Sequence, residues 1–401
     1  MKPSTIQVEA FRDNAGVERL RPVWESLQNH PNTDIDFYQT ILRERPEILR
    51  PHVMLASNQG APEVLLIGRV ERQHMSFKLG YLKLLEQKAM VVALPLGGLF
   101  GAVKEEHCAG LLQEILRLLR DREADMVSFS HLKIDDLMYT YLRSHLPWYR
   151  HCAYTGQKHR AMTIPDSVEA FYASLSAKTR KHFRQNAKKL NTDFAGQVKV
   201  KIYTTAADLP LLLEAVAAIA PKTWQRGLGV GLEMNQEMMS RFKLQAERGW
   251  LHGSVLYLAD KPCAYWLGTA YQGTLHSDFL GYDPVFSKHA PGMYLIATVI
   301  EGYCKPKEPG RLALIDFGLG DALYKQQLGT IEWTEASLQV YATSFKGLTL
   351  VFLTKSLGLI DRVVRTFLEK TNLRDRIKSL WRKTARPTAA ASESGAGKSD
   401  S

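Results

Sequence analysis

Three side chains in the second half of the chain have the types and the spacing that acid–base chemistry requires. Asp316 interrupts the apolar run 312–317, where a buried carboxylate needs a partner. His276 and Asp278 are two residues apart in a strand-like stretch, so their side chains share one face of the strand. A histidine and a carboxylate are groups that accept and deliver protons. We therefore expect a base and an acid on this face, although polar residues of a strand also line solvated edges.

The residues around Asp316 leave two interpretations open. Lys325 or Arg311 could form a structural ion pair with this carboxylate, or the carboxylate could be catalytic and position an acceptor. Asp321 precedes a short expected helix, and we interpret it first as the cap of that helix, because a carboxylate near a helix start accepts backbone N–H groups.

Other kinds of active site are not indicated. The twelve histidines include no HExxH pattern, and the chain has no GxSxG elbow and no Walker A sequence, so we expect no metal. The glycines of GLGVG at 227–231 predict a flexible loop, and Trp224 and Trp266 are interpreted as core residues. The cysteines lie far apart with no CxxC pair, which excludes a zinc ribbon and a disulfide framework; they are Cys108, Cys152, Cys263 and Cys304.

The elements that would position these residues occur twice in the same order. Each half of the chain reads as hairpin, strand, loop, helix and strand. In the first half the strands are 52–57, 64–71, 90–94 and 126–129, with a Gly-rich loop at 95–101 and a helix around 111–119. In the second half the strands are 251–259, 264–271, 274–282 and 312–317, with a loop at 283–291 and a helix at 292–303. The repetition predicts two α+β domains of one type, with chance similarity as the alternative.

The remaining segments complete a division of the chain. Residues 178–189 predict a basic amphipathic helix, which is either a solvated face or a contact for an anionic ligand. We expect an N-terminal domain at 1–150, a connecting segment with this helix at 151–200 and a second domain at 201–345. A basic helical segment at 346–386 and a small, polar, disordered tail at 387–401 follow.

The formal charge of +11 is concentrated near the C-terminus. Residues 341–386 hold eleven Lys and Arg against three Asp and Glu, or +8. The remainder is nearly neutral, which argues against a nucleic-acid partner. The basic helix could contact an anionic membrane or pack on the body. The chain shows neither an apolar run of about 20 residues nor an apolar leader, so we expect a cytoplasmic protein that is at most peripheral at the inner membrane face.

Three stretches carry a resemblance to a known family: KTRKHFRQNAKKL, HSDFLGYDPVFSKHAPGMYLIATVIEGY and LIDFGLGDALYKQQLG. Over residues 178–329 the chain resembles the GNAT superfamily, in the branch of cellulose and exopolysaccharide biosynthesis acetyltransferases. That branch is similar to the Fem-type aminoacyl transferases, which are built from tandem GNAT-like domains. The resemblance implies an α+β fold of tandem GNAT-like domains, each with a mixed, mostly antiparallel sheet flanked by helices.

The resemblance also implies an activity and its site. The acyl thioester would lie where strands 274–282 and 312–317 part, and Tyr324 would protonate the leaving thiolate. The phosphates of acetyl-CoA, the co-substrate, would lie at the start of helix 292–303. There a helix N-terminus attracts anions, although the same residues also suit an ordinary helix start. The residues implied to bind the cofactor are Lys288, His289, Gly292 and Met293; those implied for catalysis are Tyr324, Asp316, Asp278 and His276.

The acceptor implied is a sugar, a polysaccharide precursor, another small molecule or an amine, which receives an acyl group on nitrogen or oxygen. Two alternatives stay open. The first is a Fem-like aminoacyl transfer from charged tRNA, which the basic segment 178–189 could serve. The second is a non-catalytic binding or scaffold subunit that keeps the fold.

Overall fold

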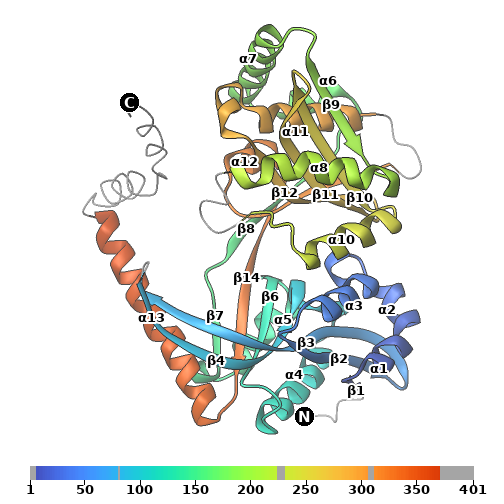
Figure 1. The fold of residues 1–401 in the computed structure, drawn as a ribbon. Helices are drawn as coiled ribbons and strands as arrows, with labels where there is room; N and C mark the ends of the chain where they lie inside the picture. The colour runs from blue at the N-terminus through green and yellow to red at the C-terminus, as the bar shows by residue number, and fades with distance from the viewer. Residues whose placement is uncertain (1–5, 80–81, 224–230, 306–310, 371–401) are drawn as a thin grey trace, which may run out of the picture.

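The computed structural model describes residues 6–79, 82–223, 231–305 and 311–370, with side chains at 6–77, 84–223, 231–305 and 311–360 (Figure 1). Trp224, most of the loop 227–231 and the tail 387–401 lie outside these residues. One sheet of fourteen strands runs through the described chain, in the order β1-β2-β3-β4-β6-β14-β8-β13-β12-β11-β10-β9, with β5 on β3 and β7 on β14. The strands are β1 (Ile6–Phe11), β2 (Ile48–Asn58), β3 (Ala61–Leu79), β4 (Leu82–Leu94), β5 (Leu99–Gly101), β6 (Met126–Lys133), β7 (His151–Ala153), β8 (Gln157–Thr163), β9 (Val198–Tyr203), β10 (Leu251–Leu258), β11 (Lys261–Tyr271), β12 (Thr274–Tyr282), β13 (Leu314–Leu319) and β14 (Ile331–Tyr341).

The N-terminal half, from β1 to α5, has helices on both faces of its strands. Neighbouring residues of β2 point to opposite faces, so that Met54 packs with α4 and α5 while Val53 packs with α1, α2 and α3. The expected helix around 111–119 is α4, whose apolar positions are buried with helical periodicity. The helices are α1 (Asn14–Arg19), α2 (Arg21–Leu27), α3 (Ile35–Glu44), α4 (Glu105–Arg120) and α5 (Leu137–His145).

The C-terminal half, from β8 to α12, repeats this layering. Leu256 of β10 packs on the side of α7 and α11, whereas its neighbour Val255 packs on the side of α8 and α10. The expected basic helix is α7. The helices are α6 (Val168–Ser174), α7 (Ala177–Asp193), α8 (Leu209–Ile219), α10 (Gln236–Glu247), α11 (Pro291–Tyr303) and α12 (Leu323–Leu328). The predicted α+β class, with a mixed sheet flanked by helices, is confirmed.

Two pairs of strands in the described sheet are parallel, and they occupy equivalent places in the two halves. In the N-terminal half β4 pairs with β6 over four residues, Val91–Leu94. In the C-terminal half β12 pairs with β13 over only three, with His276 opposite Asp316 as the last pair. β13 is paired on its other side with β8 from Leu314 to Leu319, and beyond the last pair with β12 it continues along β8 alone, while β12 continues along β11 to Tyr282. We call the point at His276 and Asp316, where β12 and β13 part, the fork.

Strand β14 joins the two halves. Its first part pairs with β8 and its second part with β6, both antiparallel. Leu338 and Val340 are buried in the N-terminal core with residues of β6 and α4, although they follow the C-terminal half in sequence. The division of the chain at 150, 200 and 345 stays a prediction, and it does not anticipate this crossing.

The last described helix, α13 (Phe345–Lys370), lies against β3, β7 and β14 at one side of the molecule (Figure 1). Leu350 and Val351 of this helix are buried with Phe77, Met126 and Tyr341. Among the described helices none is both long enough and apolar enough to cross a membrane.

Candidate active site

Asp316 lies at the fork between two histidines. Because Ile315 and Phe317 point into the core, the alternation of β13 directs Asp316 to the opposite face. Its Oδ1 is 2.5 Å from Nε2 of His159 on β8 and accepts the backbone N–H of Gly318 at 2.7 Å. Its Oδ2 is 3.6 Å from Nδ1 of His276.

The structural ion pair expected for Asp316 is therefore formed with other residues. Arg311 binds Asp166 at 2.9 Å, and Nζ of Lys325 donates to the carbonyl of Leu319 at 2.6 Å. The expected pairing of Asp316 with Lys325 or Arg311 is wrong, because β8, a strand distant in sequence, supplies a closer cation.

His159 lies between two carboxylates. Its Nδ1 forms an ion pair with Oε1 of Glu335 on β14 at 2.9 Å, and its ring stacks on Trp333 with centroids 4.2 Å apart. Burial disfavours the charged imidazole, but Asp316 and Glu335 outweigh it and raise the pKa of His159 to about 9. The carboxyl of Glu335 also lies 3.2 Å from Nδ1 of His131; against burial, these contacts lower the pKa of Glu335 to about 2. Burial likewise opposes ionisation of Asp316, yet the two histidines hold its pKa well below the usual range.

These shifts predict how stability depends on pH. The pKa of His159 is raised from 6.5 to about 9, so its contribution is complete below pH 6.5 and is lost as the pH rises through 9. The depressed pKa values of Asp316 and Glu335 have the opposite effect, because their contribution is lost in acid. We expect the free energy of unfolding in urea to fall by up to about 3 kcal/mol between pH 6.5 and 10. The variant H159Q should lose most of this slope; an unchanged slope would contradict the ion-pair assignment.

Asp278 lies on the same side of β12 as His276, next to Thr269. The register of β11 against β12 shifts between Leu267 and Gly268, and Oγ1 of Thr269 donates to Asp278 at 2.7 Å. Nε2 of Gln245 donates to the same Thr269 hydroxyl at 2.7 Å. Burial raises the pKa of Asp278, which makes it a carboxyl that retains its proton more readily than one in water.

Tyr324 lies in the first turn of α12 and reaches the fork. Its ring packs edge-on against Phe317, with centroids 6.0 Å apart, and its hydroxyl is hydrogen-bonded to Ser277. Ser277 is the first residue of β12 beyond the parallel pairing and accepts a hydrogen bond from the buried indole of Trp266 at 2.9 Å. Burial raises the pKa of Tyr324 to about 12, so the phenol carries its proton at neutral pH.

Asp321, in the turn before α12, does not cap that helix. The N-cap residue is Ala322 and no side chain caps the helix start, whereas Asp321 binds Nη1 of Arg160 at 2.8 Å. The capping interpretation is wrong because a strand-borne guanidinium lies within reach of this carboxylate.

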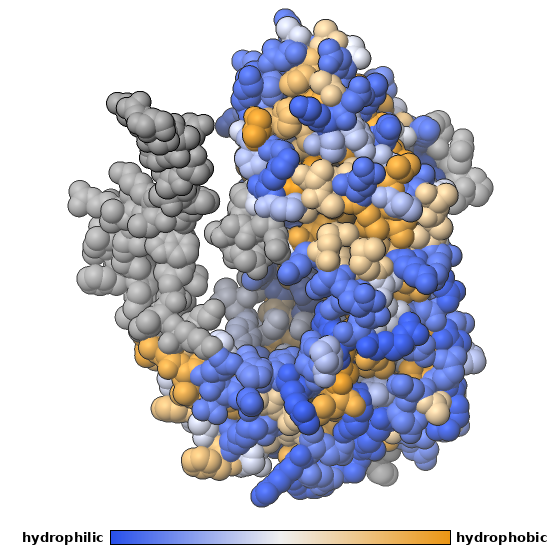
Figure 2. All heavy atoms as spheres, in the orientation of Figure 1, coloured by the Kyte–Doolittle hydropathy of each residue, from blue (hydrophilic) through white to orange (hydrophobic). Residues whose placement is uncertain are grey.

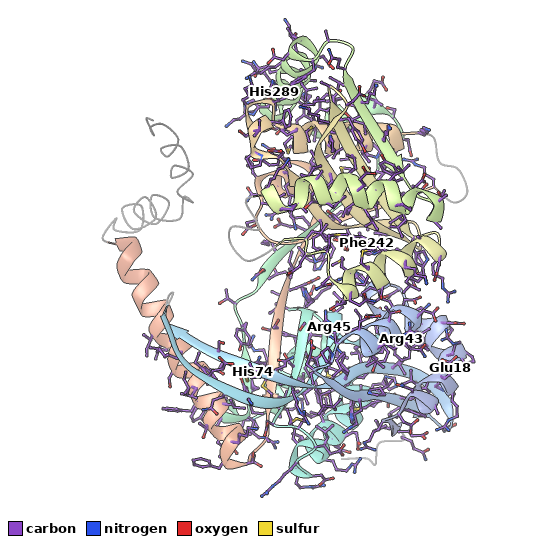
Figure 3. The ribbon with its side chains drawn as sticks, viewed as in Figure 1. Glu18, Arg43, Arg45, His74, Phe242 and His289 are labelled. Carbon is purple, nitrogen blue, oxygen red and sulfur yellow. The ribbon has the colours of Figure 1, made fainter. Side chains whose placement is uncertain are left out.

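The residues expected to bind the cofactor lie at and before the start of α11. Ala290 has a left-handed backbone (φ 48°), and no side chain caps the helix. Pro291 has no N–H, and Met293 and Tyr294 both donate to the carbonyl of Ala290 at 3.1 Å, so among the described residues at this start only the N–H of Gly292 lacks a backbone acceptor. Gly292 is buried, and a Cβ there would be in ordinary van der Waals contact with the side chains of Tyr282 at 3.7 Å and Leu280 at 4.0 Å. His289 is buried instead, with Nε2 2.8 Å from Asp193 of α7 (Figure 3). The carbonyl of Lys288 accepts a hydrogen bond from Lys189 of α7 at 3.1 Å.

The N-terminal half adds a residue to the fork that the sequence did not indicate. The ring of His30 lies 4.3 Å from that of His276, centroid to centroid. Nδ1 of His30 accepts the N–H of Asn32 at 3.1 Å, so the neutral ring carries its proton on Nε2. Burial lowers the pKa of His30 to about 3, which keeps the ring neutral. His30 is thus a neutral hydrogen-bond donor at the fork.

His30, His276 and Asp316 each have a ligand-type atom within 4.8 Å of the others, a spacing that a divalent cation could bridge. The hydrogen bonds already present oppose that use. The proton on Nε2 of His30 makes this atom a donor, and Oδ1 of Asp316 is taken by His159 and Gly318. The geometry therefore favours acid–base chemistry over metal binding.

Contacts between the halves hold His30 in place. The hydroxyl of Tyr271 donates to the buried Asp34 at 3.0 Å, and Arg45 binds Glu237 of α10 at 2.8 Å (Figure 3). Two cavities lie between the halves and both have His131 in their walls. One of about 410 Å³ is also lined by Glu335 and Gln157, and one of about 360 Å³ is also lined by Asn32, Arg69, Glu71 and Arg241. Each of the two cavities is thus lined by polar side chains from both halves.

Besides His30, the sequence-based search missed His159, His131, Trp333, Glu335 and Ser277. These residues come from β8, β6, β14 and β12, and no local spacing relates the strands. The available signal was weak: Asp316 interrupts an apolar stretch in β13, whereas Glu335 lies in β14 among other polar residues, such as Glu332 and Thr334, and does not stand out. Of the predicted residues, the structure brings His276, Asp278, Asp316 and Tyr324 together around the fork.

Known proteins with similar sequence or structure agree with this arrangement. Residues 177–326 match the model of the acetyltransferase (GNAT) domain family, while no curated protein matches the chain. Among solved structures, FemX is similar with a TM-score of 0.53 at 8% identity, over 83% of this chain and 97% of FemX. The C-terminal domain of a lysylphosphatidylglycerol synthetase from Agrobacterium fabrum gives a TM-score of 0.50 at 10% identity, over 83% and 93%. At such identities these two likenesses show the fold.

The matched residues contain β12, β13, the start of α11 and Tyr324, which are the parts that form the fork and its surroundings. The sequence-based expectation of a GNAT-type enzyme is confirmed at this level. Residues 177–326 form a GNAT acetyltransferase domain, and this part of the chain is an acyltransferase domain of the GNAT type.

Proposed function

We propose that the chain transfers an acetyl group from acetyl-CoA to an amine or hydroxyl of a small, hydrophilic acceptor. The observation that carries the proposal is the fork itself. Two parallel strands part at His276 and Asp316, and the protonated phenol of Tyr324 is hydrogen-bonded to the next residue of β12. A thioester held between the parting strands would have a proton donor on one side and an imidazole on the other.

The chain's own residues supply the proton transfers that acyl transfer needs. The acceptor attacks the thioester carbonyl and loses a proton, which His276 accepts while the Asp316 carboxylate stabilises the resulting imidazolium. The C–S bond then breaks, and Tyr324 gives its proton to the departing thiolate. His159 is already protonated at neutral pH and is not the base. Nε2–H of His30 is available to stabilise negative charge that develops at the carbonyl oxygen.

The start of α11 supports a phosphate-bearing donor. The dipole of this helix places about half a positive charge at its start, where the N–H of Gly292 has no side-chain cap, and Lys189 and Lys288 lie beside it. A Cβ on Gly292 would be in ordinary contact with Tyr282 and Leu280, so a small side chain can be placed at this helix start without a clash. A donor bound there would have its phosphates at Gly292 and Met293 and would extend along β12 toward the fork.

The cavities between the halves support a hydrophilic acceptor. Their walls carry positively charged, negatively charged and amide side chains, which suit a molecule with many hydroxyl or amino groups. These side chains include Arg69, Glu71, Arg241, Glu335 and Gln157. A sugar or polysaccharide precursor fits this chemistry. It also fits the resemblance to exopolysaccharide acetyltransferases.

Binding of acetyl-CoA tests the donor. We expect calorimetry to show saturable binding by the wild-type chain. G292D should bind at least about tenfold more weakly than G292N, since the two side chains match in size and differ in charge. No binding to the wild-type chain at millimolar acetyl-CoA would remove the proposal. Equal affinities of the two variants for acetyl-CoA would show that its phosphates do not bind at the start of α11.

The exposed basic face of α7 favours one second candidate, an aminoacyl transfer from charged tRNA. Lys178, Lys181, Arg184 and Lys188 are exposed on this helix. Affinity for tRNA would then fall steeply and linearly with the logarithm of salt concentration, because many phosphates would be neutralised. A weak salt dependence together with acetyl-CoA binding would exclude this candidate.

A further inference from the structure

Large apolar side chains are exposed together on α13 and on the short helix η3 (Trp148–Arg150). The exposed fractions are 89% for Phe345, 69% for Phe352, 61% for Leu359 and 72% for Trp148. Figure 2 shows hydrophobic residues gathered at the lower left, over the first turns of α13. Isolated exposed apolar residues are common, but a contiguous group marks an interaction surface.

The geometry of the helix explains why this group is uncovered. Phe345, Phe352 and Leu359 are seven residues apart and therefore lie on one stripe of α13. The opposite stripe, with Leu350 and Val351, is buried against the body. A helix that is apolar all round is normally buried on all sides. The body covers one face of α13, and the described chain leaves the other face bare.

The exposed face has an aromatic and cationic border. Trp148, Tyr149, Leu348, Phe352 and Leu359 line an apolar groove of about 370 Å³. Nζ of Lys355 lies 5.3 Å from the Trp148 ring centroid and donates a hydrogen bond to the Trp148 carbonyl. Tryptophan, tyrosine and lysine around an apolar strip are typical of surfaces that lie at the boundary between lipid headgroups and acyl chains.

Charge identifies the occupant. Residues 341–386, which contain α13 and the chain that follows it, carry a net charge of +8. A second copy of this chain would bring the same positive charge against the patch, whereas an anionic surface would neutralise it. We infer that the exposed face of α13, together with Trp148 and Tyr149, docks on a bilayer that contains anionic lipids. The opposite face of α13, with Leu350 and Val351, would keep the rest of the protein attached to the membrane-bound helix.

Vesicle co-sedimentation of the full chain tests this inference. We expect binding to phosphatidylcholine vesicles that contain phosphatidylglycerol, and much weaker binding to phosphatidylcholine vesicles or at high salt. F352E should weaken the binding by about tenfold or more. The control L211E, which places the same charge at an exposed leucine on α8, should bind as the wild-type chain does. A blue shift of tryptophan emission on binding should be reduced in W148F.

Three results would overturn the inference. The first is that the full chain does not sediment with the phosphatidylglycerol vesicles, as expected if its own residues 371–401 covered the exposed face of α13. F352E and L211E could bind equally well, which would leave charge as the only attraction. Light scattering without vesicles could show a dimer that F352E dissociates, and the face would then be an interface between two copies.

Discussion

Replacing Tyr324 by Phe is expected to lower kcat for acetyl transfer by about 10²–10³-fold, while the chain stays folded. The phenol is the protonated group at the fork, and its burial holds its pKa at about 12. Without it, the thiolate leaves unprotonated, but only one hydrogen bond to Ser277 is lost, at a cost of about 1 kcal/mol. The rate can be followed as release of the CoA thiol with glucosamine as acceptor.

A matched control and a changed leaving group separate chemistry from structure. Y257F also removes a partly buried phenol, one that is hydrogen-bonded to Tyr203 of β9 at 2.8 Å, and should leave the rate unchanged. The Y324F defect should shrink with an aromatic thioester, whose thiolate leaves without a proton. A folded Y324F chain with the wild-type rate would favour a non-catalytic role for the fork.

Replacing Asp316 by Ala is expected to destabilise the chain by about 3–5 kcal/mol and to abolish activity. The carboxylate is the partner of His159 at 2.5 Å, and its removal leaves a buried imidazolium with one carboxylate instead of two. Activity fails for a second reason, since His276 loses the charge that stabilises its protonated form. Urea unfolding at pH 6.5 measures the first effect and the thiol-release rate the second.

Two further variants keep the Asp316 prediction decisive. D316N preserves the shape of the site, so that it should fold if D316A does not, and it should still be inactive. D321A removes a neighbouring ion pair, that of Arg160, but Asp321 is exposed, and the loss should be at most about 1 kcal/mol. Equal destabilisation by D316A and D321A would show that the buried pair contributes no more than an exposed one.

Local sequence patterns were sufficient to predict most of the helices and strands and about half of the residues of the candidate site. The apolar periods of 2 and 3.6 residues predicted α4, α11 and the strands around them, because each element buries one face of its own sequence. Tyr324 and Asp316 could be named because a short segment, β13 followed by α12, carries both. In the N-terminal half, β3 extends to Leu79 and β4 begins at Leu82, within the stretch between 71 and 90 for which the sequence predicted no element. These parts of β3 and β4 are defined by their pairing with each other, and the residue pattern along a single strand does not predict which strand it pairs with.

The partners of the site could not be predicted for the same reason. His159, Glu335 and His30 reach the fork only through the order of the strands and the contact between the halves. Neither Arg311 nor Lys325, the nearest cations in sequence, pairs with Asp316, since the pairing of β13 with β8 delivers His159 first. Sequence distance is a poor guide to ion pairs where a sheet decides which residues meet.

The position of β14 also sets the order in which the protein can mature during its synthesis. The N-terminal core lacks Leu338 and Val340, and the fork lacks Glu335, until the ribosome has made residue 341 and the exit tunnel has released it. Until then the strands β6 and β8 lack their shared partner β14, so that each presents an unpaired edge. Nascent chains that stall before this strand should therefore be clients of chaperones, and the two halves should not be obtainable as separate stable fragments by cutting the chain between them.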